Sequence, residues 1–133
     1  MPARVLDSFA LVAYFRDEAG ADTVENLLVA ASRRDAALHM TEVNYAEVKY
    51  ILIKKNGRAA WEAAARVLAG LPIEFHTVTR SLADHAADFK SRCRLSLADA
   101  FSAALAKEKK AELVTGDPEF KEIENEIKIQ WLR

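Results

Sequence analysis

The chain has 133 residues, a length that suits one compact domain and leaves no room for two. Hydrophobic residues make up 51% and charged residues 29%, which excludes a disordered or collagen-like chain. The net charge is −1, so the composition gives no sign of a nucleic-acid-binding domain. No apolar run reaches the roughly 18 residues of a membrane-spanning helix, and the charge at Asp7 comes too early for a signal peptide. We therefore expect a cytoplasmic protein without a membrane segment.

The first elements along the chain are a strand and two helices. The strand at 4–6 is followed by a helix at 9–15 with Asp7 or Ser8 as its N-cap, because short polar side chains accept the free backbone N–H groups of a first helical turn. Apolar residues at helical spacing then predict a second helix at 22–31.

A strand at 36–40 comes next, followed by a helix that Thr41 can cap and that Gly57 ends. One row of this helix is apolar except for a single carboxylate, Glu47, and we expect the row to pack inward. Its members are Val43, Glu47, Tyr50 and Ile51.

The second half of the chain predicts three more helices and three more strands. In chain order they are a helix at 59–69, a strand at 73–78, helices at 79–89 and 96–110, a strand at 112–115, a turn at 116–118 and a strand at 127–131. Short strands joined by helices favour parallel pairing, since the tight turns of antiparallel hairpins are missing. We expect one domain over residues 1–133, an α/β fold built as a three-layer α/β/α sandwich with a mostly parallel sheet of about five strands.

The single cysteine and the three histidines suggest no metal site. Cys93 alone cannot form an intramolecular disulfide or a cysteine-cluster zinc site, and it fits a reducing compartment. His39, His76 and His85 show no spacing typical of metal ligands, so we expect each to be a surface or strand residue.

Four acidic residues fall where such a fold binds ligands, beyond the carboxyl ends of the strands. Asp7 follows the first strand, and Asp117 follows the fourth. Asp99 lies in the opening turn of the helix before the fourth strand, and Glu47 lies in the helix after the second. Each also has a purely structural reading, since Asp7 can cap a helix, Asp117 can form a turn, and Ser96 with Asp99 matches a capping box.

Two of these acids lie on surfaces that ought to be buried. Asp99 is the only charged residue in an apolar stretch of its helix, and Glu47 shares the row described above. Buried carboxylates need partners, and the basic residues fall in runs that look exposed. A divalent cation such as Mg²⁺ or Mn²⁺ would neutralise several converging carboxylates. The sequence has no glycine-rich phosphate loop and no nucleophile elbow, so nucleotide-dependent transfer and serine hydrolysis are unsupported.

Four segments that hold these acids carry a resemblance to a known family. They are 5–11 (VLDSFAL), 46–48 (AEV), 95–100 (LSLADA) and 113–120 (LVTGDPEF). In this order and spacing they resemble the PIN-domain ribonucleases, most closely the VapC toxins of prokaryotic toxin–antitoxin systems, over essentially the whole chain. The resemblance implies an Mg²⁺- or Mn²⁺-dependent endoribonuclease, a homodimer, and inhibition by a small VapB-like antitoxin.

Carried onto this sequence, the resemblance assigns metal binding and catalysis to Asp7, Glu47, Asp99 and Asp117. The hydroxyls of Ser8 and Thr115 would orient carboxylates or bound water, although many relatives carry a second hydroxyl where this chain has Phe9. Glu119 would be auxiliary at most and solvent-facing. A bound metal ion would activate a water molecule for in-line attack on the phosphodiester.

Because an acidic site repels RNA, nearby basic side chains must attract the substrate. The candidates are Lys90, Arg92 and Arg94, and the alternative is that this run is only a solvated surface. The antitoxin could dock in an apolar groove between the helices at 9–16 and 41–55. Two other functions stay open: a nuclease that acts on DNA or in RNA processing without a toxin role, and a catalytically silent PIN-like module that only binds.

Overall fold

The structure is a computed structural model that describes residues 2–34 and 36–133. Five strands form one sheet in the order β3-β2-β1-β4-β5, and every neighbouring pair runs parallel. The strands are β1 (Arg4–Leu6), β2 (Leu38–Thr41), β3 (Ile73–His76), β4 (Glu112–Thr115) and β5 (Ile129–Trp131). The helices are α1 (Ser8–Arg16), α2 (Ala21–Ser32), α3 (Glu42–Asn56), α4 (Arg58–Ala69), α5 (Arg80–Arg92), α6 (Leu97–Lys109) and the short 3-10 helix η1 (Pro118–Ile123).

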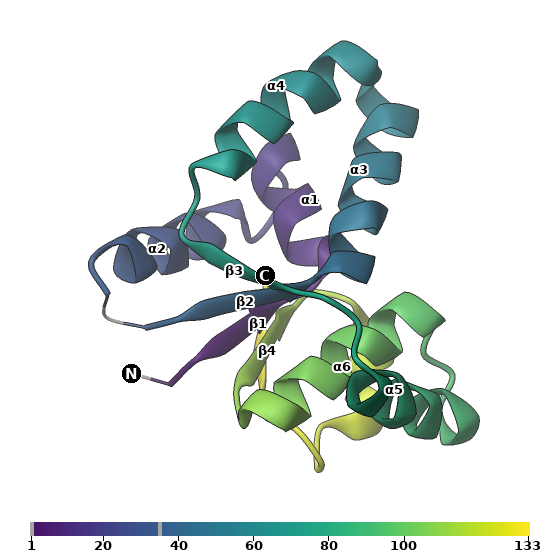
Figure 1. Cartoon of the computed structure of the whole chain (residues 1–133). Coiled ribbons are helices and arrows are strands. Elements are labelled where there is room, and N and C mark those ends of the chain that lie inside the picture. Colours follow the sequence, from purple (N-terminus) through teal and green to yellow (C-terminus); the bar gives the residue numbers. More distant parts are fainter. Residues whose placement is uncertain (1, 35) are drawn as a thin grey trace.

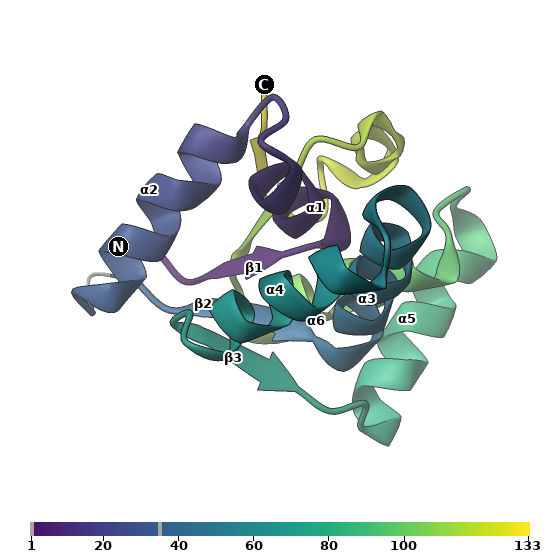
Figure 2. The same ribbon diagram turned by 90° about the horizontal axis from the view of Figure 1, so that it is seen from above.

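Helices cover both faces of the sheet, which gives three layers (Figure 1). Successive side chains of a strand point to opposite faces. Leu6 therefore joins the core beneath α1 to α4, while Val5 joins the core against α5 and α6. On β4, Val114 likewise joins the core beneath α1 to α4, and Leu113 joins the core against α5 and α6. Figure 2 looks down on the sheet and shows α1, α3 and α4 on the near side of the strands. The predicted α/β/α sandwich with a five-stranded parallel sheet is confirmed.

Short polar side chains begin the helices that surround the carboxyl ends of the strands. Asp7, Thr41 and Ser96 each accept a backbone N–H from the first turn of α1, α3 and α6, as their sequence context predicts. Such a cap stabilises a helix by about 1 kcal/mol. The longest of these helices, α3, spans 15 residues. In the described part of the chain, no helix combines the length and the apolar character needed to cross a membrane.

The inward row predicted for α3 is wrong. The buried residues of this helix are Asn44, Val48 and Leu52, whereas Tyr50 is 53% exposed. Apolar residues occur on several sides of α3, so spacing alone does not select the inward face; packing against β2 and the neighbouring helices does. Glu47 consequently lies half-buried beside the core instead of within it.

The region around the predicted turn at 116–118 holds more structure than the sequence suggested. The turn continues into η1, which begins at Pro118 and buries Phe120 and Ile123 in the core against α6. The first turn of α6 also differs, because Leu97 is exposed although it belongs to the apolar stretch around Asp99 that was expected to be buried. Both differences lie at the end of the sheet where the acids gather.

Candidate active site

A hollow of about 440 Å³ lies at the carboxyl ends of β1 and β4. Strand order changes direction here, since β2 and β3 extend the sheet from one side of β1 while β4 and β5 extend it from the other. Open parallel sheets bind ligands at such a point. We call it the acidic hollow, and its lining residues are Ser8, Phe9, Val12, Glu18, Glu47, Ile51, Lys55, Ser96, Asp99, Asp117 and Glu119.

Asp7 directly follows β1, next to Ser8 of the hollow, and is only 1% exposed. Its Oδ1 accepts the N–H of Ala10 at 2.9 Å, which caps α1 and fixes the carboxyl group at the end of β1. Its Oδ2 is buried and has no hydrogen-bond partner among the described residues. Burial raises the pKa of Asp7 to about 8; the nearby Thr115 hydroxyl and the Ala10 N–H oppose this shift only in part.

Asp99 enters the hollow from the first turn of α6. The Ser96 hydroxyl accepts the Asp99 N–H at 3.1 Å, so the predicted capping residue positions the start of this helix. Burial, followed by the negative charge of Asp117, raises the pKa of Asp99 to about 7. The charge of Glu47 acts in the same direction. Asp99 therefore lies near other carboxylates in a poorly hydrated place, which disfavours its ionised form.

Asp117 and Glu119 come from the segment between β4 and η1. The Thr115 hydroxyl accepts the Asp117 N–H at 3.0 Å, and Asp117 Oδ1 accepts the Glu119 N–H at 2.9 Å. Carboxylate oxygens of Asp99, Asp117 and Glu119 all lie within 4.8 Å of one another. Glu119 is exposed, as predicted, but it belongs to the acidic group that lines the hollow.

Glu47 reaches the hollow from α3 and is held by a hydroxyl of α1. The Ser8 hydroxyl donates a hydrogen bond to Glu47 Oε1. A second link joins α3 to α6, because the buried Asn44 donates from Nδ2 to the Ala98 carbonyl at 3.1 Å. Ser8 was a predicted auxiliary residue, whereas Asn44 was missed. Its role depends on the contact between two helices, and no local pattern in the sequence signals that contact.

Apolar side chains form one wall of the hollow. Phe9 and Val12 come from α1 and Ile51 comes from α3, so this wall lies where the sequence predicted an apolar groove. Phe9 packs against Gly116 so closely that a Cβ atom at Gly116 would lie 2.3 Å from its ring. Glycine at this position lets the ring close over the end of β4.

The predicted RNA-binding residues lie outside the hollow. Among the described residues, Lys55 is the only cationic side chain in the lining. Arg92 is engaged elsewhere, with both terminal nitrogens 2.7 Å from the carboxylate oxygens of Glu126. Lys90 and Arg94 are exposed, and neither lines the hollow. Lys55 was overlooked because the 54–55 pair reads as part of an exposed basic run at the end of a helix.

The donor set of the hollow fits a hard divalent cation such as Mg²⁺ or Mn²⁺. Every candidate ligand is a carboxylate oxygen, the kind of donor these ions prefer. The unpartnered Asp7 Oδ2 and the raised pKa values of Asp7 and Asp99 show that the described residues poorly compensate the negative charge that ionisation of these carboxyls would create. A cation among these oxygens would compensate it.

The family model of the PIN domain matches residues 4–126, so the chain belongs to the PIN-domain family. The predicted family resemblance is thereby confirmed. No curated protein sequence matches the chain.

Solved structures of VapC and VapBC proteins share the fold. The DNA-bound VapBC of Salmonella typhimurium aligns with a TM-score of 0.77 at 17% identity, covering 98% of both chains. VapBC2 of Rickettsia felis, bound to a DNA fragment from its promoter, aligns with a TM-score of 0.76 at 17% identity, covering 98% of this chain and 99% of the other. VapC20 of Mycobacterium tuberculosis, described as a sarcin–ricin-loop-cleaving toxin, aligns with a TM-score of 0.74 at 20% identity, covering 90% and 94%. The match extends over the whole domain.

Proposed function

We propose that the chain is an endoribonuclease that depends on Mg²⁺ or Mn²⁺ and acts as the toxin of a VapBC-type pair. The observation that carries the proposal is the acidic hollow, which carboxylates from several segments line and beside which Asp7 buries a carboxylate oxygen that lacks a partner among the described residues. Membership of the PIN-domain family and the toxin named among the structural neighbours support it.

The proposed metal ligands are Asp7, Asp99 and Asp117, with Glu47 or Glu119 acting directly or through water. A bound Mg²⁺ or Mn²⁺ supplies a water molecule of lowered pKa and neutralises charge on the phosphodiester. The Ala10 N–H occupies Asp7 Oδ1, so the unpartnered Oδ2 would be the Asp7 oxygen available to hold the ion. Because metal binding favours ionised carboxylates, it would lower the pKa values of Asp7 and Asp99 from their raised metal-free values.

Neighbouring side chains would orient the ligands and hold the substrate. Ser8 fixes the Glu47 carboxylate by its hydrogen bond, and Thr115 fixes the backbone at Asp117. Lys55 is placed to attract an RNA phosphate at the rim of the hollow. The predicted run of Lys90, Arg92 and Arg94 would contribute at a longer range.

RNA is the proposed substrate class because a structural neighbour, VapC20, is described as a sarcin–ricin-loop-cleaving toxin. The proposed partner is a VapB-like antitoxin, since several neighbours are VapBC complexes. The apolar wall of Phe9, Val12 and Ile51 offers that partner a surface beside the acids. A homodimer is part of the same proposal, and light scattering of the purified chain tests it.

Cleavage of a total-RNA pool, with single-stranded DNA as a control, tests the central proposal. The assay compares Mg²⁺ or Mn²⁺ with a chelator and the parent chain with Asp99→Asn. We expect metal-dependent RNA cuts that vanish in the variant, and sequencing of the new ends identifies the target. Equal cleavage by parent and variant, or cleavage that persists in chelator, would contradict the assignment.

A further inference from the structure

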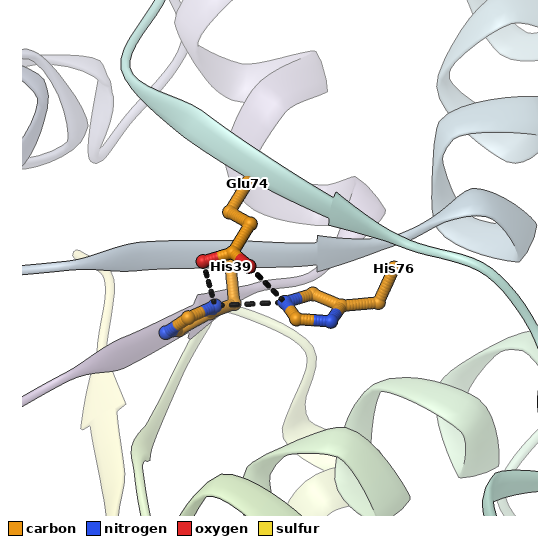
Figure 3. Close-up of side chains that lie close together, drawn as sticks. All are labelled: His39, Glu74 and His76. Atoms are coloured by element: carbon orange, nitrogen blue, oxygen red, sulfur yellow. Dashed lines mark hydrogen bonds and ion pairs between the residues drawn. The ribbon is translucent and has the colours of Figure 1, made fainter.

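A second group of metal-ligand side chains lies on the sheet, away from the acidic hollow. His39 is on β2, and Glu74 and His76 are on β3, the strand at one edge of the sheet. The register pairs His39 with Glu74 across the two strands, and His76 lies two residues further along. All three side chains consequently project from the same face of the sheet. We call this group the edge cluster (Figure 3).

The potential ligand atoms of the edge cluster all lie within 4.8 Å of one another. His39 Nδ1 is 2.8 Å from His76 Nε2 and 3.5 Å from Glu74 Oε2, and His76 Nε2 is 4.0 Å from Glu74 Oε1 (Figure 3). Ligands bound to Zn²⁺ at its usual bond lengths lie about 3.3 Å apart at the tetrahedral angle. The three separations lie within about 0.7 Å of this value, so side-chain shifts of that size would bring all three donors onto one ion.

Burial distinguishes this group from an ordinary surface contact. The side chains of His39 and His76 are 9% and 18% exposed, whereas that of Glu74 is 66% exposed. The two imidazoles are held in the sheet face, and the carboxylate reaches them from the solvent side. Burial, and next the neighbouring His76, lower the pKa of His39, which favours the neutral ring that metals bind.

We propose that His39 Nδ1, His76 Nε2 and a Glu74 carboxylate oxygen bind one Zn²⁺ ion, with a fourth position open to water. Two imidazoles and one carboxylate suit zinc, in contrast to the all-oxygen set of the acidic hollow. Such an ion would join β3 to β2 through side chains from both strands. It would thereby strengthen the edge of the sheet, where backbone groups have a partner strand on one side only.

Zinc binding is measured by calorimetry on the full chain carrying Asp99→Asn and Asp117→Asn, which weaken binding in the acidic hollow. We expect uptake of one Zn²⁺ and a rise in Tm on the order of 10 °C when free Zn²⁺ is a hundred times its Kd. Adding His76→Ala to this background should weaken zinc binding by at least about 100-fold, since loss of a direct ligand costs no less than loss of a supporting residue. Glu74→Gln, at an exposed position, tests the third ligand without disturbing the core.

His85→Ala is the matched control, because His85 contacts Glu108 on the surface of α5 and α6 and lies outside the edge cluster. This variant should bind Zn²⁺ as the background does. Co²⁺ in place of Zn²⁺ provides a second measurement, in which the visible absorption of a four-coordinate ion should disappear with His76→Ala. Absence of Zn²⁺ uptake in the background chain, or uptake that His76→Ala leaves unchanged, would overturn the proposal. This test does not depend on nuclease activity.

Discussion

The acidic hollow gathers its carboxylates from segments spread between residues 7 and 119, whereas the edge cluster takes its three ligands from two neighbouring strands. The hollow offers only oxygen atoms, and its most buried carboxyl group is held at the end of a central strand. The edge cluster offers two nitrogen atoms and one carboxylate on an edge strand. Both groups bring potential ligand atoms within 4.8 Å of one another.

The difference shows how one parallel sheet can prepare two chemically distinct sites. Convergence at the carboxyl ends of strands depends on the whole topology and gathers acids, whose carboxyl pKa values are raised first by burial and then by one another's charge. Side chains that face each other on two paired strands need only the local register of those strands to meet, whatever their chemical type. A hard ion suits the first group, and a borderline ion suits the second.

The contrast between the acidic hollow and the edge cluster would be broken most clearly if the acids of the hollow were not needed for RNA cleavage. Asp99→Asn should lower the rate of RNA cleavage by at least about a hundredfold, because it removes a charged ligand worth several kcal/mol in a metal site. The rate is measured with excess Mg²⁺ or Mn²⁺. Asp84→Asn, an exposed acid on α5, is the control and should cleave at the parental rate.

The charge in the hollow should also lower the stability of the metal-free chain. The folded pKa of Asp7 is about 8 against the ordinary aspartate value of 3.8, so the folded protein binds more protons than the unfolded chain between these pH values. The free energy of unfolding should therefore fall as pH rises from about 4 to about 8. Asp7→Asn, which keeps a helix-capping side chain, should remove this loss, an effect on the order of several kcal/mol.

Denaturant unfolding at pH 5 and pH 8 in chelator measures this effect. The parent should be less stable at pH 8, and the difference should shrink in Asp7→Asn and in the parent when Mg²⁺ or Mn²⁺ is added. Equal pH dependence in the two chains would show that the Asp7 carboxyl does not carry the uncompensated charge.

A Ser8 variant tests whether groups that only orient the metal ligands contribute less to cleavage than the ligands themselves. Ser8→Ala removes the hydrogen bond to Glu47 while all four acids remain. RNA cleavage should fall about tenfold, and part of the loss should be recovered at higher metal concentration, because supporting groups tune metal affinity. A loss as large as that of Asp99→Asn would instead place Ser8 among the groups that contact the substrate.

The smallest expected effect concerns substrate attraction. Lys55→Ala should weaken RNA binding several-fold. It should also reduce the slope of log affinity against log salt concentration by about one unit, the change expected for the loss of one phosphate contact. The change is measured in the cleavage-deficient Asp99→Asn chain. Replacing Lys90, Arg92 and Arg94 together tests the original prediction, and a larger slope change there than at Lys55 would favour the basic run.

Much of the site could be predicted because its acids lie beside strong local signals. Asp7 directly follows an apolar strand, and Asp99 belongs to a capping pattern that begins at Ser96. The signals that place both residues lie within a few neighbouring positions of the sequence. Their placement at one edge then follows from the parallel sheet, which the alternation of strands and helices indicates.

The residues that escaped prediction depend on contacts between distant segments. Tyr50 was assigned to the core because its spacing allowed this, but the packing of α3 exposes it. Glu119 joins the acids only because η1 turns immediately after β4. The edge cluster needs β3 to lie beside β2 in one register, and no spacing between His39 and His76 encodes that arrangement.

The position of β4 in the sheet also bears on when the acidic hollow first exists. β4 pairs with β1, so the two strands that precede Asp7 and Asp117 are separated by nearly the whole chain. During synthesis, domains fold as units while the chain emerges from the ribosome. A nascent chain that ends before residue 112 lacks both β4 and Asp117, a carboxylate of the hollow. If the proposed function holds, the nuclease should therefore be inactive through most of its own translation, and fragments truncated before β4 should not cleave RNA.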